Sequence, residues 1–195
     1  MKTVKTFVTL AAMLVAGTAL AQGADKKPAA AAPPPAEKPA AKPPEMAMPM
    51  KAPAEMDPMK WMVGTWKCDG KQSMGGKEMP AKGTYKMAWD LDNMWLVGHY
   101  EAAKAKGMPK TFKGVDYYTY DDGKKEYVQL SIDNMGGWGK MTSKGLEGDK
   151  LAWTGKAMMG AKEIDSKQTI TKKSDKELTV DIANGDETYN ATCKK

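Results

Sequence analysis

The sequence contains no arginine, since all 30 of its basic residues are lysines. Arginine carries the planar, bidentate fork that proteins favour for recognising phosphate and guanine. Its absence argues against a nucleic-acid or phosphate-recognition protein. The net charge of +6 is better explained by lysines spread over a solvated surface, with at most a weak attraction to anionic envelope components. The mean hydropathy of -0.58 excludes an integral membrane protein with several spans.

Residues that carry catalysis or hold metals are also scarce. His99 is the single histidine, no serine lies in a Gly-x-Ser-x-Gly context, and no cluster has metal-ligand spacing. The glycine pairs 75–76 and 136–137 are not followed by a helix, as a phosphate-binding loop would be. The carboxylates fall mostly in turns; Asp116 and Asp133 suit a barrel interior, although their spacing does not require it. We therefore expect a non-enzymatic protein without a cofactor.

The first 21 residues have the pattern of a cleavable secretory signal peptide. Lys2 and Lys5 precede an apolar stretch from Phe7 to about Leu20, and Ala19-Leu20-Ala21 gives the small-x-small cleavage site. The apolar stretch is short and alanine-rich for a membrane anchor, and no nearby cysteine offers a lipoprotein anchor. The pattern predicts a periplasmic or secreted protein whose mature chain begins at residue 22.

Residues 22–56 are rich in alanine, proline, lysine and methionine and contain no aromatic residue. Such a segment cannot bury enough apolar area to offset its ordering entropy, so we expect a disordered tether that also offers attachment to an envelope partner. Met46, Met48 and Met50 alternate within it. Thioethers are soft ligands that select Cu(I), so one hypothesis is a copper site. The alternative is compositional, because the chain has 17 methionines.

Residues 57–195 are expected to form one all-β domain. Asp57 and Pro58 resemble the N-cap and first position of one helical turn. Short alternating segments separated by turn signals then predict about ten strands, at 65–72, 83–90, 94–102, 112–120, 126–133, 138–144, 151–158, 164–172, 178–184 and 187–193. Consecutive strands with short turns predict an up-and-down antiparallel meander that closes into a barrel, because open edges are a liability. The alternative two-sheet sandwich needs long crossovers that are not evident.

Four segments carry a family resemblance: WMVGTWKCDG, WDLDNMWLVGHYEA, FKGVDYYTYDD and YVQLSIDNMGGWG, in this order. Gly64-Thr65-Trp66 after a helical turn resembles the Gly-x-Trp start of the calycin barrels, which include lipocalins, fatty-acid-binding proteins and nitrobindin-like proteins. The ordered set resembles bacterial domain-of-unknown-function family number fifteen seventy-nine, over roughly residues 57–193. The resemblance implies a closed calycin-like barrel with Trp66 as a structural plug, and it implies no established activity.

The sequence departs from these relatives at two points. Many calycins pack a late-strand arginine over the tryptophan; here Lys194 or nothing takes that role. Nitrobindin-like proteins bind haem through a C-terminal histidine and have a glycine-rich first strand. Here Cys68 interrupts the glycine series and the C-terminal region has no histidine, so haem binding is not carried over.

Cys68 and Cys193 are the only cysteines, and they fall in the first and last expected strands. These strands are neighbours in a closed barrel, and antiparallel pairing places the start of one opposite the end of the other. An even cysteine count in an exported chain favours a disulfide. The alternatives are two free thiols or a metal site without other ligands.

Aromatic residues at strand spacing either fill a core or line a pocket for an apolar ligand. The residues that we expect to contact such a ligand are Trp89, His99, Tyr118, Trp138 and Trp153. The first hypothesis is an exported barrel that binds a small apolar ligand, by analogy of fold. The second is a filled barrel with a structural or interaction role, and an enzyme ranks last because no catalytic constellation is present. A large interior void would favour the first hypothesis over the second.

Overall fold

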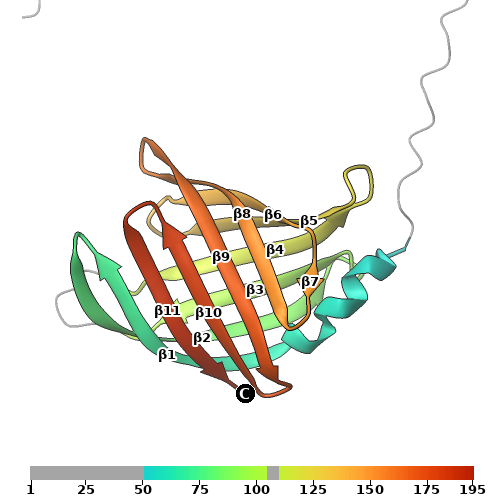
Figure 1. Ribbon diagram of the computed structural model, residues 1–195, viewed down its shortest axis with the longest axis horizontal. Coiled ribbons are helices and arrows are strands. Elements are labelled where there is room, and N and C mark those ends of the chain that lie inside the picture. The colour runs from blue at the N-terminus through green and yellow to red at the C-terminus, as the bar shows by residue number, and fades with distance from the viewer. Residues whose placement is uncertain (1–50, 105–109) are drawn as a thin grey trace, which may run out of the picture. The chain divides into compact units, whose positions relative to one another are not determined.

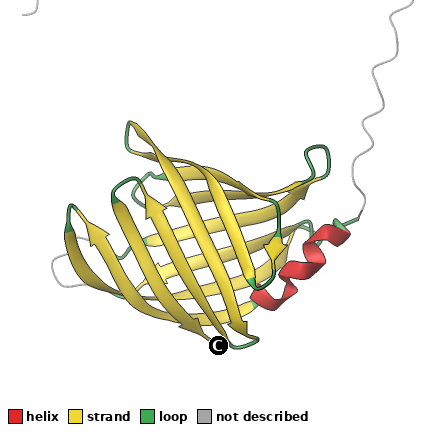
Figure 2. Ribbon diagram, viewed as in Figure 1, coloured by secondary structure: helices red, strands yellow, loops and turns green. Residues whose placement is uncertain are grey.

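The computed structural model describes residues 51–104 and 110–195. It shows an antiparallel barrel preceded by one short helix (Figures 1 and 2). The elements are η1 (Ala54–Met62), β1 (Gly64–Met74), β2 (Lys77–Asp90), β3 (Trp95–Ala102), β4 (Lys113–Asp121), β5 (Glu126–Asp133), β6 (Trp138–Ser143), β7 (Leu146–Glu147), β8 (Lys150–Met159), β9 (Lys162–Ser174), β10 (Glu177–Asn184) and β11 (Glu187–Lys194). The predicted signal peptide, most of the tether and the methionine series lie outside the described residues.

Two pairings close the ring of ten long strands. Each long strand pairs with its sequence neighbours, β6 pairs with β8 across the two-residue β7, and β1 pairs with β11. Short turns make consecutive pairing inexpensive in loop entropy, and closure removes exposed strand edges. The predicted closed meander is therefore confirmed, and the sandwich is excluded. No helix among the described residues has the length and apolarity needed to cross a bilayer.

The helix η1 covers one end of the barrel. It starts earlier in the chain than the helical turn that the sequence predicts. It begins at Ala54, three residues before the N-cap that Asp57 suggested, and Pro53 is its N-cap. Met56, Met59 and Met62 are each 1% exposed. Because η1 is a 3-10 helix with three residues per turn, a spacing of three places all three methionines on one face. Their burial against the barrel outweighs the local N-cap signal.

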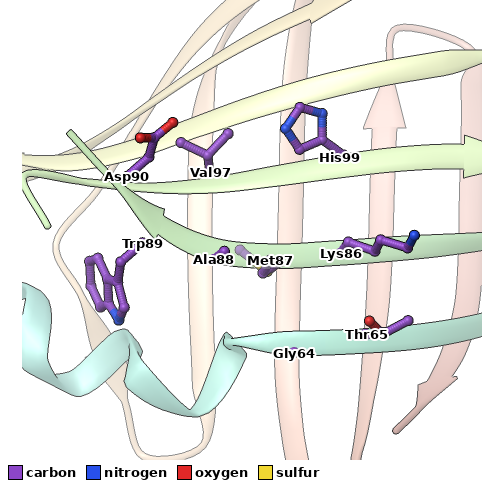
Figure 3. A pocket seen from close by; sticks show the side chains of 9 residues that line it. All are labelled: Gly64, Thr65, Lys86, Met87, Ala88, Trp89, Asp90, Val97 and His99. Carbon is purple, nitrogen blue, oxygen red and sulfur yellow. The ribbon is translucent and has the colours of Figure 1, made fainter. Parts of the chain in front are cut away.

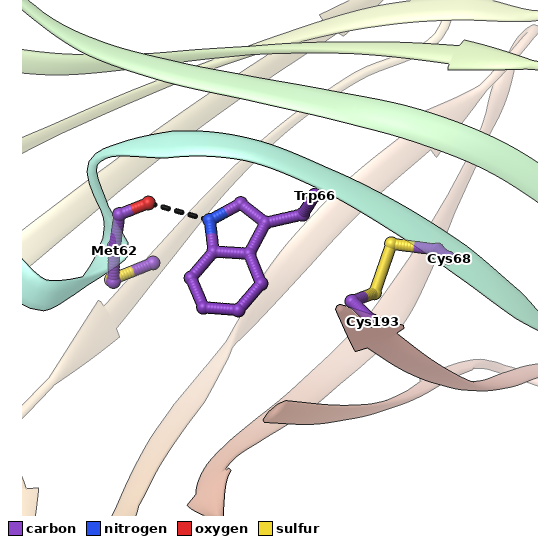
Figure 4. The surroundings of a disulfide bond; sticks show 4 residues. All are labelled: Met62, Trp66, Cys68 and Cys193. Carbon is purple, nitrogen blue, oxygen red and sulfur yellow. Dashed lines mark hydrogen bonds between the residues drawn. A yellow bond between two sulfur atoms is a disulfide. The ribbon is translucent and has the colours of Figure 1, made fainter. Parts of the chain in front are cut away.

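Trp66 occupies the core above η1. Its side chain is 0% exposed, and its indole Nε1 donates a hydrogen bond of 2.7 Å to the Met62 carbonyl oxygen (Figure 4). The cation over its ring is Lys195, whose Nζ lies 4.4 Å from the ring centroid, and not Lys194. Residues alternate across a strand, so Lys194 points outward, where it pairs with Glu177 at 3.3 Å.

A disulfide joins the first and last strands. Cys68 and Cys193 are register partners in the β1–β11 pair with a Cα–Cα distance of 4.0 Å, and their bond lies beside Trp66 (Figure 4). This pair of strands is the one that chain closure rather than a hairpin brings together. The disulfide predicted from topology is present, and it accounts for both cysteines of the chain.

The other end of the barrel is its mouth. The β1–β2, β5–β6, β8–β9 and β10–β11 turns, the end of β3 and the start of β4 lie there, opposite η1 (Figure 1). Inward-facing residues near η1 are buried, whereas Tyr100, Asp116 and Ser131 nearer the mouth are half-buried. The interior is thus sealed by η1 at one end and reaches solvent at the other.

Candidate functional site

The interior contains a polar cluster that we call the Asp116 cluster, made of residues from β2, β4 and β5. Its members are Tyr85, Asp116, Tyr118, Gln129 and Ser131. On β5 the polar residues face inward, whereas Leu130 and Ile132 face outward and are 37% and 51% exposed. Successive side chains of a strand point to opposite faces. In β5 the more polar of these two faces points into the barrel. Alternation in the sequence defines the two faces of β5, but it does not show which face is inside.

The Asp116 carboxylate is held through both of its oxygens. Tyr85 donates to Oδ2 at 2.7 Å, Gln129 Nε2 donates to Oδ1 at 3.2 Å, and the Ser131 hydroxyl also donates to Oδ1. The hydroxyls of Tyr85 and Tyr118 lie 2.9 Å apart. Because Tyr85 gives its proton to the carboxylate, Tyr118 donates to the Tyr85 oxygen. The cluster is therefore a connected network that is centred on one carboxylate.

Burial dominates the titration behaviour of the cluster. Desolvation raises the pKa of Asp116, although the hydrogen bonds from Ser131, Tyr85 and Gln129 each lower it. Desolvation, together with the Asp116 charge, raises the pKa of Tyr85 and of Tyr118 well above the ordinary tyrosine value. Both phenols consequently remain neutral donors at physiological pH.

Two glycines make room for the aromatic side chains that span the strands. Gly98 on β3 lies between Met87 on β2 and Asp116 on β4 in the strand register. A Cβ at Gly98 would lie 2.3 Å from the Tyr85 hydroxyl oxygen. The bare backbone of Gly98 thus lets Tyr85 cross β3 and reach Asp116. A Cβ at Gly83 would likewise lie 2.5 Å from the hydroxyl oxygen of Tyr100.

Two polar atoms beside the cluster have no hydrogen-bond partner. They are Gln129 Oε1, an acceptor, and Trp153 Nε1, a donor. Both side chains are buried, at 2% and 1% exposure, and the Trp153 ring centroid lies 5.5 Å from that of Tyr118. A buried polar atom without a partner costs about 1–3 kcal/mol. These two atoms are therefore the unsatisfied polar groups of this part of the core.

The residues expected to contact a ligand divide between the two faces of the barrel. Tyr118 and Trp153 face inward and belong to the buried core, and Trp89 packs against that core. His99 lies on the outer face, opposite Lys86 and Val115 in the register. Trp138 also lies on the outer face and is 57% exposed. Strand alternation therefore removes His99 and Trp138 from the interior.

His99 borders a shallow external groove of about 310 Å³ on β1, β2 and β3 (Figure 3). Lys86 and Asp90 contribute the charged groups of this groove. Asp90 accepts a hydrogen bond from the backbone N–H of Leu91 at 2.7 Å, so its carboxylate serves the β2–β3 turn. Across residues 51–104 and 110–195, no group of three or more His, Cys, Asp or Glu side chains could hold a metal ion.

Sequence reasoning selected Tyr118 and Trp153 and missed Tyr85, Gln129 and Ser131. Asp116 was recognised as suited to an interior, and the structure places it there. Asp133 also faces inward, but its carboxylate accepts the backbone N–H groups of Met135 and Gly137, at 2.7 and 2.9 Å. One signal in the sequence was available. Gly98 lies two residues after Leu96 and therefore on the same inward face of β3, where the missing side chain leaves room for a neighbouring aromatic side chain to cross the strand.

Comparison with known proteins supports the fold and identifies a family. The crystal structure of Rv2717c from M. tuberculosis matches with a TM-score of 0.57 and 11% sequence identity, over 74% of this chain and 99% of that chain. The structure of the S-type phycobiliprotein lyase CPES from Guillardia theta matches with a TM-score of 0.49 and 9% identity, over 70% of this chain and 89% of that chain. At such identities the likeness to Rv2717c shows the fold alone, a calycin-like barrel. No curated protein matches the chain.

The family comparison covers most of the described domain. The family described as Protein of unknown function (DUF1579) matches residues 52–191, which run from just before η1 into β11. The chain therefore belongs to the DUF1579 family.

Proposed function

We propose that the barrel binds a small, largely apolar molecule that carries an uncharged hydrogen-bonding group. The observation that supports this proposal is the pair of buried, unpartnered atoms, Gln129 Oε1 and Trp153 Nε1, beside the Asp116 cluster. Binding sites of this kind combine an apolar lining with a few polar groups that fix the orientation of the ligand. The ligand enters from the mouth, because η1 covers the other end.

The two atoms define the polar group of the ligand. Gln129 Oε1 requires a donor and Trp153 Nε1 requires an acceptor. A hydroxyl or a primary amide supplies both. An ionised carboxylate carries no donor for Gln129 Oε1, so we propose an alcohol-like or amide-like ligand over an acidic one.

The proposed role is binding without catalysis. Both Asp116 oxygens already accept protein hydrogen bonds, and both neighbouring phenols have raised pKa values. A general base needs a free lone pair near the reacting proton, and the three donors Tyr85, Gln129 and Ser131 already occupy three of the about four lone-pair sites of Asp116. We propose that Asp116 positions Tyr85, Ser131 and Gln129 around the ligand.

The proposed location is the periplasm or the exterior of the cell. The Cys68–Cys193 disulfide is consistent with an oxidising, extracytoplasmic compartment, and the N-terminal pattern is that of a signal peptide. N-terminal sequencing of exported protein tests the cleavage after Ala21. A mature chain that still begins at Met1 would contradict it.

Native mass spectrometry of protein purified from its own host tests the ligand proposal. The wild type is expected to carry a small molecule that Gln129→Leu loses, because leucine removes the acceptor. Leu130→Ala is the matched control, since its side chain lies one residue away on the outer face, and it is expected to retain the molecule. A folded wild type that carries only its own mass and binds no Nile red, an uncharged apolar dye, would contradict the proposal and favour a filled, structural barrel.

A further inference from the structure

The exposed apolar side chains are concentrated at the mouth. Within the described ranges, 51–104 and 110–195, the large hydrophobic residues that are markedly exposed number seven. Five of them lie at mouth-end turns or in the strand positions next to those turns, namely Met74, Ile132, Met135, Trp138 and Met159. Leu130 lies on the outer face of β5, and Leu91 lies at the opposite end beside η1. A large exposed apolar patch on one side of a protein marks an interaction site.

The strand register joins most of these residues into one surface. Ile132 on β5 is the register partner of Trp138 on β6, and Trp138 is the partner of Met158 on β8. Met158 is half-buried beside Trp138, and Met135 lies in the turn between β5 and β6. We call these four residues the mouth patch: Ile132, Met135, Trp138 and Met158.

The turn that carries the patch is held in place. Asp133 accepts hydrogen bonds from the backbone N–H groups of Met135 and Gly137. Asn134 accepts one from the Lys113 N–H at 3.1 Å and donates one to the Thr111 carbonyl oxygen at 2.8 Å. Met135 and Trp138 are therefore presented to solvent by an ordered turn, at 53% and 57% exposure.

Lysines surround the mouth patch. Lys140 and Lys156 lie in the next outward row of β6 and β8 and are register partners. Lys162 lies at the start of β9, and the Lys110 ammonium donates to the Asn134 carbonyl oxygen at the β5–β6 turn. Three carboxylates lie nearby: Asp133 accepts the backbone N–H groups of its own turn, and Asp165 and Glu163 both pair with Lys156, at 2.7 and 3.8 Å. With four lysines against three carboxylates, the border of the patch keeps a net positive charge.

We propose that the mouth patch docks the barrel onto the surface of an anionic lipid bilayer. Tryptophan prefers the headgroup level of a membrane, and an apolar patch of this kind buries its side chains at the boundary with the acyl chains. Each lysine near an anionic surface adds electrostatic attraction. A second copy of the chain is disfavoured as the occupant, because docking through the same patch would bring like-charged lysines together. Docking requires no bound ligand, so the docking proposal and the ligand proposal can be tested independently.

Co-sedimentation of the full-length mature chain with vesicles tests the proposal. Vesicles of phosphatidylcholine mixed with phosphatidylglycerol are expected to bind the wild type, and pure phosphatidylcholine vesicles are expected to bind it more weakly. The triple variant Ile132→Thr, Met135→Ser, Trp138→Thr is expected to lose about tenfold or more in affinity. Leu91→Asn is the matched control, because it removes an equally exposed apolar side chain at the opposite end, and it is expected to bind like the wild type.

Three outcomes would overturn the proposal. One is the absence of wild-type binding to the phosphatidylglycerol vesicles. Another is equal affinity of the wild type and the triple variant, which would assign any binding to the basic N-terminal segment. The third is a wild-type dimer in light scattering that the triple variant converts to a monomer, which would assign the patch to a second copy. Circular dichroism of the triple variant checks that the barrel remains folded.

Discussion

Asp116 is a carboxylate whose raised pKa originates in burial rather than in a neighbouring negative charge. The hydrogen bonds from Tyr85, Ser131 and Gln129 favour its ionised form, and desolvation disfavours it more strongly. At the scale of single residues, the cluster thus contains one carboxylate whose ionised form is destabilised by desolvation and stabilised by three hydrogen-bond donors. Such combinations occur where a site is shaped for recognition.

The substitution Asp116→Asn is expected to remove one component of the pH dependence of stability. Since the pKa of Asp116 is higher in the folded than in the unfolded protein, its contribution favours folding at pH values below about 4 and is lost as the pH rises through the raised pKa. As the pH rises through the raised pKa of Asp116, the free energy of unfolding of the wild type should therefore fall relative to that of the variant. Urea denaturation at a series of pH values measures it.

The control for this experiment is Asp186→Asn, which changes an exposed carboxylate in the β10–β11 turn. Its pH profile is expected to follow that of the wild type. Parallel profiles for wild type and Asp116→Asn would show that the Asp116 charge is not a significant cost to the fold.

Gly98 is the residue whose replacement tests the geometry of the cluster. In Gly98→Ala the new Cβ would lie 2.3 Å from the Tyr85 hydroxyl oxygen, so Tyr85 must leave Asp116. We expect a loss of about 1–3 kcal/mol in the free energy of unfolding, measured by urea denaturation. Gly114→Ala is the control, because its nearest contact would be an ordinary 3.5 Å. Equal losses in both variants would contradict the close approach of Tyr85.

At the scale of single elements, η1 shows how a short helix gains its stability from tertiary contacts. A nine-residue 3-10 helix with an internal proline is not stable alone, because helix nucleation is costly. The methionine spacing of three matches the period of this helix, and the barrel end provides the surface that buries it. The flexible methionine side chain suits an irregular gap of this kind.

Substitution of Met59 by alanine is expected to cost about 2–5 kcal/mol, because Met59 is 1% exposed and the change leaves a cavity beneath η1. Thermal and urea denaturation measure this loss. Met74→Ala is the control, since Met74 is 41% exposed, and it is expected to change the stability by less than about 0.5 kcal/mol. A small loss in Met59→Ala would show that η1 contributes little to the fold.

At the scale of the whole molecule, the barrel depends on the junction between β1 and β11. The other strand pairs join strands that follow one another in the chain, except β6–β8, which is bridged by β7 and its short turns. The β1–β11 pair brings together cysteines that are 125 residues apart in the chain. Contacts of such sequence separation lose the most chain entropy on forming.

Replacing both cysteines by alanine is expected to lower the free energy of unfolding by about 2–4 kcal/mol, because the cross-link no longer restricts the unfolded chain. Urea denaturation of the double variant measures this loss, and the wild type treated with a reductant is the matched comparison and should lose a similar amount. Free thiols at both positions in exported wild-type protein, found by peptide mapping without reductant, would contradict the link.

The amino-acid sequence by itself determined the features that depend on neighbouring residues. Alternation and turn signals gave the strands and their meander, and the positions of Cys68 and Cys193 then gave the disulfide once closure was assumed. The expected N-cap of η1, Asp57, lies four residues after the observed one, Pro53, because the burial of Met56 depends on a surface that is distant in the sequence. For the cation over Trp66 the sequence offered Lys194 or nothing, and Lys195 takes this role because strand alternation decides which lysine faces the ring.

The tertiary structure alone decided which face of each strand is inside. Val128, Leu130 and Ile132 have the pattern of a core face, yet the pairing with β4 turns Gln129 and Ser131 toward Asp116. A period of two defines two faces and does not orient them. The inward direction is set by the register of the whole ring, and so the Asp116 cluster, whose members Tyr85 and Asp116 are 31 residues apart, exists only in the closed barrel.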